Sequence, residues 1–314
     1  MATWVVAAGA LAGCYAPAPA EGLACASGEA CPDGQRCDVA AGVCVRVGVD
    51  AAARVDAAAE VDAFPDAAVG EFGALTLLED VTVGEDESPT MSADGLVLVF
   101  SSTRVGAVGG AALFLSERAS RTSPWSIPAR IVELDSAQYE ACPELTSDGA
   151  ALYFVNQSVL RFSERGEDGT WSAPIDAPDE LQGGQYNCAA FSGDQRRALV
   201  GQLAVGRITQ SLLTREDVAE PWGFVGALFL TDLHSIQTPW LDADGGTVVL
   251  DGRPGALDDD DLYVATQTAA GEYGPPVRWD ALSLDGVNDR SPTFTADLRD
   301  VILERDGFLY EATR

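Results

Sequence analysis

The chain has 314 residues, of which 47% are hydrophobic, and carries a formal net charge of −30. This length and apolar content suffice for one large core plus an appendage. All 19 basic residues are arginine, and the chain has 49 acidic residues. Because such a surface repels phosphate backbones and anionic headgroups, nucleic-acid binding is disfavoured and membrane attachment requires a dedicated device.

The N-terminus predicts that device. Residues 4–13 form an apolar run that is too short to span a bilayer but long enough for a signal peptide. The run ends in Leu-Ala-Gly before Cys14, which resembles the bacterial lipobox, although the preceding Met-Ala-Thr lacks the usual positive charge. The resemblance implies removal of residues 1–13 and lipidation of Cys14. Since Tyr15 rather than Asp follows, it also implies an outer-membrane anchor that faces the periplasm or the cell surface. The alternatives are an ordinary cleaved signal peptide and a chance apolar run.

A small cysteine-rich segment, residues 25–44, follows the anchor segment 14–24. Its four cysteines are Cys25, Cys31, Cys37 and Cys44. A segment this short cannot bury a core, so two disulfides are expected to stabilise it, in any of three connectivities. A zinc site is the competing interpretation, and the absence of a Cys-x-x-Cys pair or a nearby histidine disfavours it.

The composition of residues 45–71 predicts a flexible linker. They contain a six-residue repeat built on Val-Asp-Ala, with regularly spaced acids, a proline and few large apolar groups. This composition is typical of a disordered spacer that holds a domain away from the membrane.

An internal repeat fills residues 72–314 and is the strongest signal in the sequence. Five stretches share a Pro position, a large apolar residue two positions later and Asp five positions later. The Pro positions are Pro89, Pro143, Ala189, Pro239 and Pro292. They stand 54, 46, 50 and 53 residues apart, which is the spacing of four-stranded propeller blades.

Each repeat predicts four strands. The first strand carries its proline near the start, where a missing hydrogen-bond donor does least harm. Asp-Gly then forms a tight turn in three of the five repeats. Because Gln195 and Leu298 replace this glycine, their turns are expected to differ in type. The fourth strand is predicted to open with an aromatic residue, at Trp125, Trp171, Trp222 and Tyr273.

The last repeat ends after its third strand. Phe72 stands 17 residues before Pro89, and the other aromatic residues stand 17 to 19 residues before the next Pro position. Residues 72–79 are therefore predicted to be the missing outer strand of the last blade. The predicted fold is all-β, a five-bladed propeller whose last blade is closed by an N-terminal strand.

The repeat also resembles a known family. The phrase Ser-Pro-x-x-Ser-x-Asp-Gly, the following Leu-x-Phe-x-Ser, and Asp-Leu-Tyr before a Trp-containing strand resemble the WD40-like repeats of periplasmic TolB-type propellers. The resemblance implies the fold of residues 72–314. Propellers of this kind serve as binding platforms and also accompany enzymes.

One face of the predicted propeller is the expected binding surface. It collects the loops that join outer to inner strands and second to third strands, with Glu87, Glu140, Tyr186, Asn187, Trp240, Arg253 and Arg290. Trp240 stands where other repeats carry smaller residues, so it is either inter-blade packing or a stacking surface. The expected partner is a protein or a glycan of neutral or cationic character, bound by a monomer.

The sequence offers little catalytic equipment. His234 is the only histidine and has no nucleophile motif around it, so a non-enzymatic role is expected. A glycan-active enzyme is the alternative if two carboxylates meet over the channel. No cofactor is expected, and the acidic run Asp258, Asp259, Asp260 and Asp261 is a weak candidate for Ca²⁺.

Cys142 and Cys188 occupy the same position in adjacent repeats. They could form a disulfide. Alternatively the position requires only a small side chain, because Ser88, Thr238 and Ser291 occupy it elsewhere.

Overall fold

The computed structural model describes residues 35–38, 43–46, 72–107, 109–183, 188–204, 207–228, 233–269 and 271–314. The predicted signal peptide, Cys14, Cys25, Cys31 and nearly all of the linker lie outside these residues. The chain divides into two units. In the part that is described, no helix has the length and apolar character needed to cross a membrane.

The first unit contains an antiparallel hairpin of β1 (Gln35–Asp38) and β2 (Val43–Arg46). Its backbone register places Cys37 opposite Cys44. An isolated two-stranded hairpin is at best marginally stable in water, which is the physical reason for expecting disulfides in this segment.

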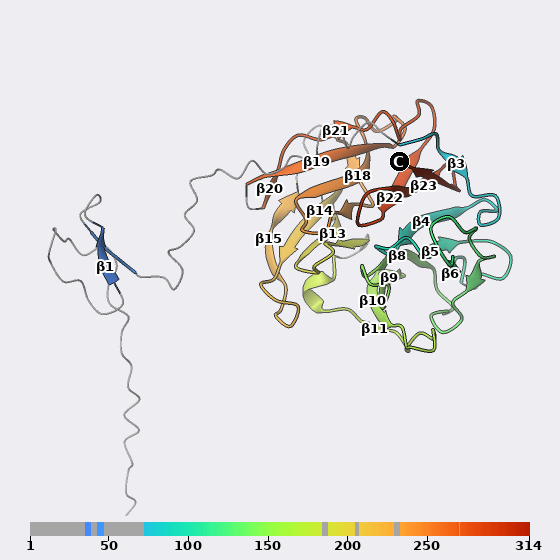
Figure 1. Ribbon diagram of the computed structural model, residues 1–314, viewed down its shortest axis with the longest axis horizontal. Helices are drawn as coiled ribbons and strands as arrows, with labels where there is room; N and C mark the ends of the chain where they lie inside the picture. The colour runs from blue at the N-terminus through green and yellow to red at the C-terminus, as the bar shows by residue number, and fades with distance from the viewer. Residues whose placement is uncertain are drawn as a thin grey trace, which may run out of the picture. The chain divides into compact units, whose positions relative to one another are not determined.

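The second unit is a five-bladed β-propeller, as predicted (Figure 1). Blade 1 contains β4 (Asp86–Met91), β5 (Val97–Ser102), β6 (Ala112–Glu117) and β7 (Ala129–Arg130). Blade 2 contains β8 (Glu140–Leu145), β9 (Ala151–Asn156), β10 (Val159–Glu164) and β11 (Ile175–Asp176). A short 3₁₀ turn, η1 (Asp179–Leu181), then leads to blade 3. Blade 3 contains β12 (Ala189–Phe191), β13 (Arg197–Ala204), β14 (Arg207–Thr214) and β15 (Gly223–Leu228).

Blade 4 has an interrupted inner strand and an interrupted outer strand. It contains β16 (Ser235–Ile236), β17 (Trp240–Leu241), β18 (Thr247–Arg253), β19 (Asp261–Ala269), β20 (Glu272–Tyr273) and β21 (Val277–Arg278). Blade 5 contains β22 (Asp289–Phe294), β23 (Asp300–Arg305), β24 (Phe308–Thr313) and β3 (Thr76–Leu77). The inner strands contact one another in a closed ring of β4, β8, β12, β17 and β22.

The hydrophobic core lies between the blades. Alternating apolar residues of each middle strand face the neighbouring sheet, and five separate clusters result, one at each of the five interfaces between blades. The cluster between blades 4 and 5 joins Leu262 and Trp279 to Phe294 and Leu303. Each blade thus buries its two faces against two different neighbours, so a missing blade edge exposes apolar surface.

The tight turns between inner and second strands are alike in all five blades. Positive φ occurs at Gly95, Gly149 and Gly245, and also at Gln195 and Leu298, both with φ of 56°. The expectation of a different turn type at the last two is therefore wrong. The preceding Asp holds the turn in each of these two blades: Asp194 accepts a hydrogen bond from Ser192 at 2.7 Å and Asp297 from Thr295 at 2.8 Å. These side-chain contacts impose the left-handed conformation on residues that have a Cβ.

The prolines do not stand at the strand starts. In blades 1, 2 and 5 the inner strand begins three residues before the proline, and the register shifts across it. The residue before each proline has positive φ, with values of 51° at Ser88, 47° at Cys142 and 50° at Ser291. A β-bulge therefore accommodates the proline inside the strand.

The N-terminal strand closes the last blade, which confirms that prediction. β3 pairs with β24, matching Leu77 with Tyr310, and Gly73 N donates to Thr313 O at 2.9 Å. Phe72 precedes the strand and packs on Trp279 and Phe294, with ring centroids 5.8 and 6.1 Å away.

Arginines that follow the third strands stack over the aromatic residue that recurs in the repeats. The guanidinium-to-centroid distances are 4.2 Å for Arg118 over Trp125, 5.7 Å for Arg165 over Trp171, 4.2 Å for Arg215 over Trp222 and 4.4 Å for Arg314 over Phe72. Three of these aromatic residues, Trp125, Trp171 and Trp222, lie before the outer strands of blades 1 to 3 rather than opening them. The aromatic residue therefore anchors the outer strand by packing under the arginine.

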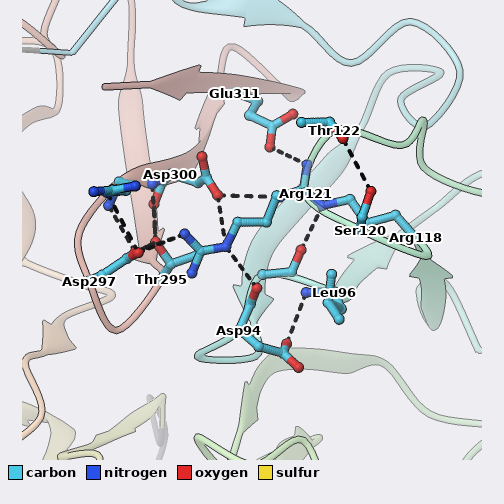
Figure 2. Close-up of polar contacts among 12 residues, drawn as sticks. Asp94, Leu96, Arg118, Ser120, Arg121, Thr122, Thr295, Asp297, Asp300 and Glu311 are labelled. Atoms are coloured by element: carbon cyan, nitrogen blue, oxygen red, sulfur yellow. Dashed lines mark hydrogen bonds and ion pairs between the residues drawn. The ribbon is translucent and has the colours of Figure 1, made fainter.

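Two arginines of blade 1 bind blade 5 where the ring closes (Figure 2). Arg118 forms ion pairs with Glu311 at 2.7 Å and with Asp300 at 3.6 Å. Arg121 pairs with Asp297 at 2.8 Å, and this contact lowers the pKa of Asp297 to about 2. Charged contacts thus reinforce the apolar packing at this closure.

Candidate functional site at the channel mouth

Five equivalent small residues surround the channel at one end of the propeller. They are Ser88, Cys142, Cys188, Thr238 and Ser291. Cys142 and Cys188 form a disulfide between blades 2 and 3, with a Cα separation of 5.2 Å. Thr238 and Ser291 share a hydrogen bond of 2.9 Å between blades 4 and 5. The ring of small residues is therefore cross-linked in two places.

A cavity of about 420 Å³, here called the mouth cavity, opens above this ring. All five blades contribute to its wall. Besides the five small residues, its polar lining consists of Glu87, Tyr139, Gln157, Gln237, Asp251, Arg290 and Glu304. Val155 and Ile208 add apolar surface. A concave site with a few convergent polar groups is the usual form of a ligand pocket.

Asp251 is fully buried at the base of the mouth cavity. Its Oδ1 accepts hydrogen bonds from the hydroxyl of Thr238 and, at 2.9 Å, from the backbone N–H of Thr238. Its Oδ2 is buried and has no hydrogen-bond partner among the described residues. Burial raises the pKa of Asp251 to about 6, because the charged form is poorly solvated there.

Glu304 and Glu87 are the other two carboxylates of the mouth cavity. Glu304 is 5% exposed, and burial together with the nearby charge of Glu87 raises its pKa to about 7. Glu87 accepts a hydrogen bond of 3.1 Å from the Tyr139 hydroxyl, and burial and Glu87 raise the pKa of Tyr139 to about 12. The tyrosine therefore stays a neutral donor at the rim.

Arg290 lines the same cavity, but its guanidinium is bonded to a carboxylate that is not part of the cavity wall. Its Nε donates to the buried Asp260 at 2.7 Å, and its Nη2 lies 2.5 Å from the same carboxylate. Arg253 pairs with Asp260 as well, at 3.2 Å, and is not part of the cavity wall. Asp260 thus positions two arginines, of which one reaches the mouth.

Of the seven residues that the sequence assigned to this face, the structure brings together Glu87 and Arg290. Glu140 is fully buried and bonded to Ser136 and, at 2.8 Å, to Asn156, so it fixes strand ends instead. Tyr186 and Asn187 lie outside the described residues.

Trp240 is not part of the mouth cavity either. Its ring packs 4.8 Å from that of Phe294, and it lines a separate small cavity of about 60 Å³ deeper in the channel. Three residues at the equivalent position bond to the next blade instead. Met91 N donates to Thr293 at 2.9 Å, Leu145 N to Thr90 at 3.0 Å and Phe191 N to Glu144 at 3.3 Å. Aromatic packing therefore takes over, between blades 4 and 5, the role that hydrogen bonds play elsewhere in the ring.

Replacing the half-buried Trp240 by Ala should reduce the free energy of unfolding by about 3 kcal/mol, because the change opens a cavity against Phe294. Ligand affinity of the folded protein should stay the same. Denaturant titration and a binding measurement on this variant check both points. A loss of affinity with unchanged stability would instead place Trp240 at the binding surface.

Glu144 shares the inner channel with Trp240. Burial raises its pKa from 4.5 to about 8, and hydrogen bonds from Phe191 N and Thr90 oppose this only weakly. The folded protein therefore keeps a proton on Glu144 at pH values where the unfolded chain has released it.

The protein should accordingly be most stable in mild acid. A raised carboxyl pKa contributes stability that is complete below pH 4.5 and is lost as the pH rises to about 8. The stabilising contributions of Asp251 and Glu304 are likewise lost as the pH rises, to about 6 for Asp251 and to about 7 for Glu304. Between pH 5 and 8, Glu144→Gln should remove about 3 to 4 kcal/mol of this pH dependence, because each pH unit changes the free energy of unfolding by up to about 1.4 kcal/mol. Thermal melts of this variant beside Glu167→Gln, an equal charge change at an exposed site, test this. Parallel pH profiles would contradict it.

The acidic run Asp258–Asp261 does not converge on one point. Asp260 is buried against Arg290, whereas Asp261 opens β19 and pairs with Arg278 at 2.8 Å. In the described part of the chain, no group of three or more His, Cys, Asp or Glu side chains is placed to hold a metal ion. His234 donates its backbone N–H to Arg253 O at 2.6 Å and does not line the mouth cavity.

Asp251 and Glu304 are the site residues that the sequence analysis missed. Each stands twelve residues after the Pro position of its repeat, where the other blades carry Ser101, Val155 and Gly201. Two carboxylates at a position otherwise small or apolar, in adjacent blades, are the signal that could have found them.

The fold and the cavity define the chain as a five-bladed β-propeller with a polar cavity at one channel mouth. No family model and no curated protein matches the sequence. TolB from Acinetobacter baumannii is similar in structure, with a TM-score of 0.44, 15% identity and coverage of 74% of this chain. This chain spans 55% of the length of that protein. A putative TolB from Agrobacterium tumefaciens has a TM-score of 0.44 and 13% identity over 69% of each chain. A functionally unknown protein from Desulfotomaculum acetoxidans has a TM-score of 0.42 and 11% identity over 69% of this chain and 78% of its own. The assignment of strands to the five blades depends on the hydrogen-bonded strand order within each sheet.

Proposed function

We propose that the chain is a lipid-anchored binding module of the bacterial cell envelope, whose propeller holds a protein or glycan partner at the mouth cavity. The observation that carries the proposal is the cavity of about 420 Å³, to whose wall all five blades contribute, four of them with polar side chains. A monomer suffices, because one ring of blades completes the cavity.

The Cys142–Cys188 disulfide supports an exported location, because such bonds persist in oxidising compartments. The lipobox-like sequence before Cys14 then supplies the anchor, in the outer membrane and facing the periplasm or the surface. Replacing Cys14 by Ser should abolish acylation and release the protein from the detergent phase. Mass spectrometry of the N-terminal peptide gives the direct readout. An unacylated N-terminus in the parent protein would refute the anchor.

Charge reversal tests the binding surface. Glu87→Arg places a long cation at the rim of the mouth cavity, so it should reduce partner capture from the native membrane, or binding on a glycan array, at least tenfold. Glu167→Arg is the matched control, because it makes the same charge change in the exposed connection between β10 and β11. Equal losses in the two variants, or none in either, would refute the mouth as the binding surface.

One observation favours a second candidate, a glycan-active enzyme. Asp251 and Glu304 meet at the channel mouth, and both have raised pKa values, as an acid catalyst of glycoside cleavage requires. Release of new reducing ends from a glycan panel is the assay. Asp251→Asn or Glu304→Gln should abolish such release, and activity that persists in both would exclude these carboxylates.

A further inference from the structure

The mouth cavity holds more negative than positive charge. Glu87, Asp251 and Glu304 line it, and among the described lining residues Arg290 is the one cation. The guanidinium of Arg290 is already bonded to Asp260 behind the wall. The negative charge of the mouth is therefore only partly compensated by the protein.

One oxygen in this cavity specifically needs a donor. Asp251 is fully buried, and its Oδ2 is without a hydrogen-bond partner among the described residues, whereas its Oδ1 has two bonds from Thr238. A buried carboxylate oxygen without a partner is costly. Because Asp251 lines the cavity, a ligand that enters can supply the missing donor.

The available groups favour a compact cation. Calcium needs six to eight oxygen ligands, and no such group of side chains is assembled among the described residues. A guanidinium prefers two coplanar oxygens of one carboxylate, whereas Asp251 offers a single free oxygen. An ammonium group has three donors that point in different directions, which suits Asp251, Glu304 and a hydroxyl of the small-residue ring such as Ser291.

We propose that the mouth cavity binds the primary ammonium group of its ligand, which donates hydrogen bonds to Oδ2 of Asp251 and to the carboxylate of Glu304. This inference rests on the proposed binding function and specifies the chemistry that the mouth recognises. A lysine side chain of a protein partner and an amino sugar of a glycan partner share this group.

Four small probes test the inference on the full chain at about pH 7, where both amines are mostly protonated. They are Nα-acetyl-lysine methylamide, glucosamine, and the acetylated counterpart of each, in which the ammonium is an amide. Ligand-observed NMR titration should show that an ammonium probe binds saturably, with a Kd of about 1 mM, and at least tenfold more tightly than its acetylated form. The probe that binds identifies the source of the group. Equal binding of both forms, or no saturable binding of either ammonium probe at about 10 mM, would overturn the inference.

Two variants locate the bound group. Asp251→Asn and Glu304→Gln should each reduce the affinity for the ammonium probe at least tenfold. Asp258→Asn, in the exposed acidic loop, should leave that affinity unchanged. Melting curves identify which variants are folded, and unchanged binding by a folded Glu304→Gln protein is sufficient to refute the site. If Glu87→Arg blocks partner capture but acetylation of the partner's amines does not, the binding module stands and the ammonium inference fails. If Glu87→Arg has no effect on capture, the binding module itself fails.

Discussion

A chain that lacks residues 1–79 should lose most of its stability, whereas a chain that lacks only residues 1–66 should melt close to the full-length temperature. The longer deletion removes β3, its pairing with β24, and the ring of Phe72 that packs on Trp279 and Phe294. Removal of a fully buried aromatic side chain costs about 3 to 5 kcal/mol, and the half-buried Phe72 is lost here together with the whole of β3. Since whole domains are stable by only about 5 to 15 kcal/mol, the loss should approach global unfolding.

Calorimetry of the two truncated proteins provides the measurement. Equal melting temperatures would contradict closure of the ring by residues 72–79. Arg118→Ala provides an independent test in the full chain, because Arg118 joins blade 1 to Glu311 of blade 5 and stacks on Trp125. That variant should be destabilised measurably but should remain folded at room temperature.

The double variant Cys142→Ser, Cys188→Ser should reduce the free energy of unfolding by about 4 kcal/mol. The disulfide joins residues 46 positions apart in adjacent blades, and loop-closure entropy of the unfolded chain gives a stabilisation of about that size. For a domain of this size the melting temperature should fall by about 8 to 16 °C. Serine itself fits the position, because Ser88 and Ser291 occupy it in blades 1 and 5.

Treatment of the parent protein with a reductant is the control for this substitution. The reduced parent and the double variant should melt at the same temperature, since both lack the same covalent bond between blades 2 and 3. A double variant that melts at the same temperature as the oxidised parent would show that the disulfide does not stabilise the propeller.

The blade architecture follows from the sequence because it depends on local rules. Period-two alternation, a Ser, Thr or Asp two residues before the turn Asp, and a turn residue after it specify each hairpin without reference to distant parts of the chain. The truncated last repeat and the early Phe72 then leave one outer strand without a blade and one blade without an outer strand. That mismatch was sufficient to predict the pairing of β3 with β24.

The turns at Gln195 and Leu298 show the limit of residue preference. Both residues disfavour positive φ, yet both adopt it at 56°. The flanking hydrogen bonds of Asp194 and Asp297 and the register of the paired strands override the local preference. Hydrogen bonding and strand pairing therefore decided the backbone conformation of these two turns, for which residue preference alone predicted a different turn type.

The mouth cavity was decided by tertiary structure, because its residues meet only when five blades surround one axis. Loop position placed Glu87 and Arg290 there correctly, but it could not show that Glu140 bonds within its own blade or that Trp240 packs against the next blade. The sequence left open whether the two equivalent cysteines bridge, since only the distance between adjacent inner strands settles it, at 5.2 Å between their Cα atoms. Asp251 and Glu304 directly follow the apolar centres of β18 and β23, and their charge becomes a feature of the site only because the ends of these strands meet at the channel.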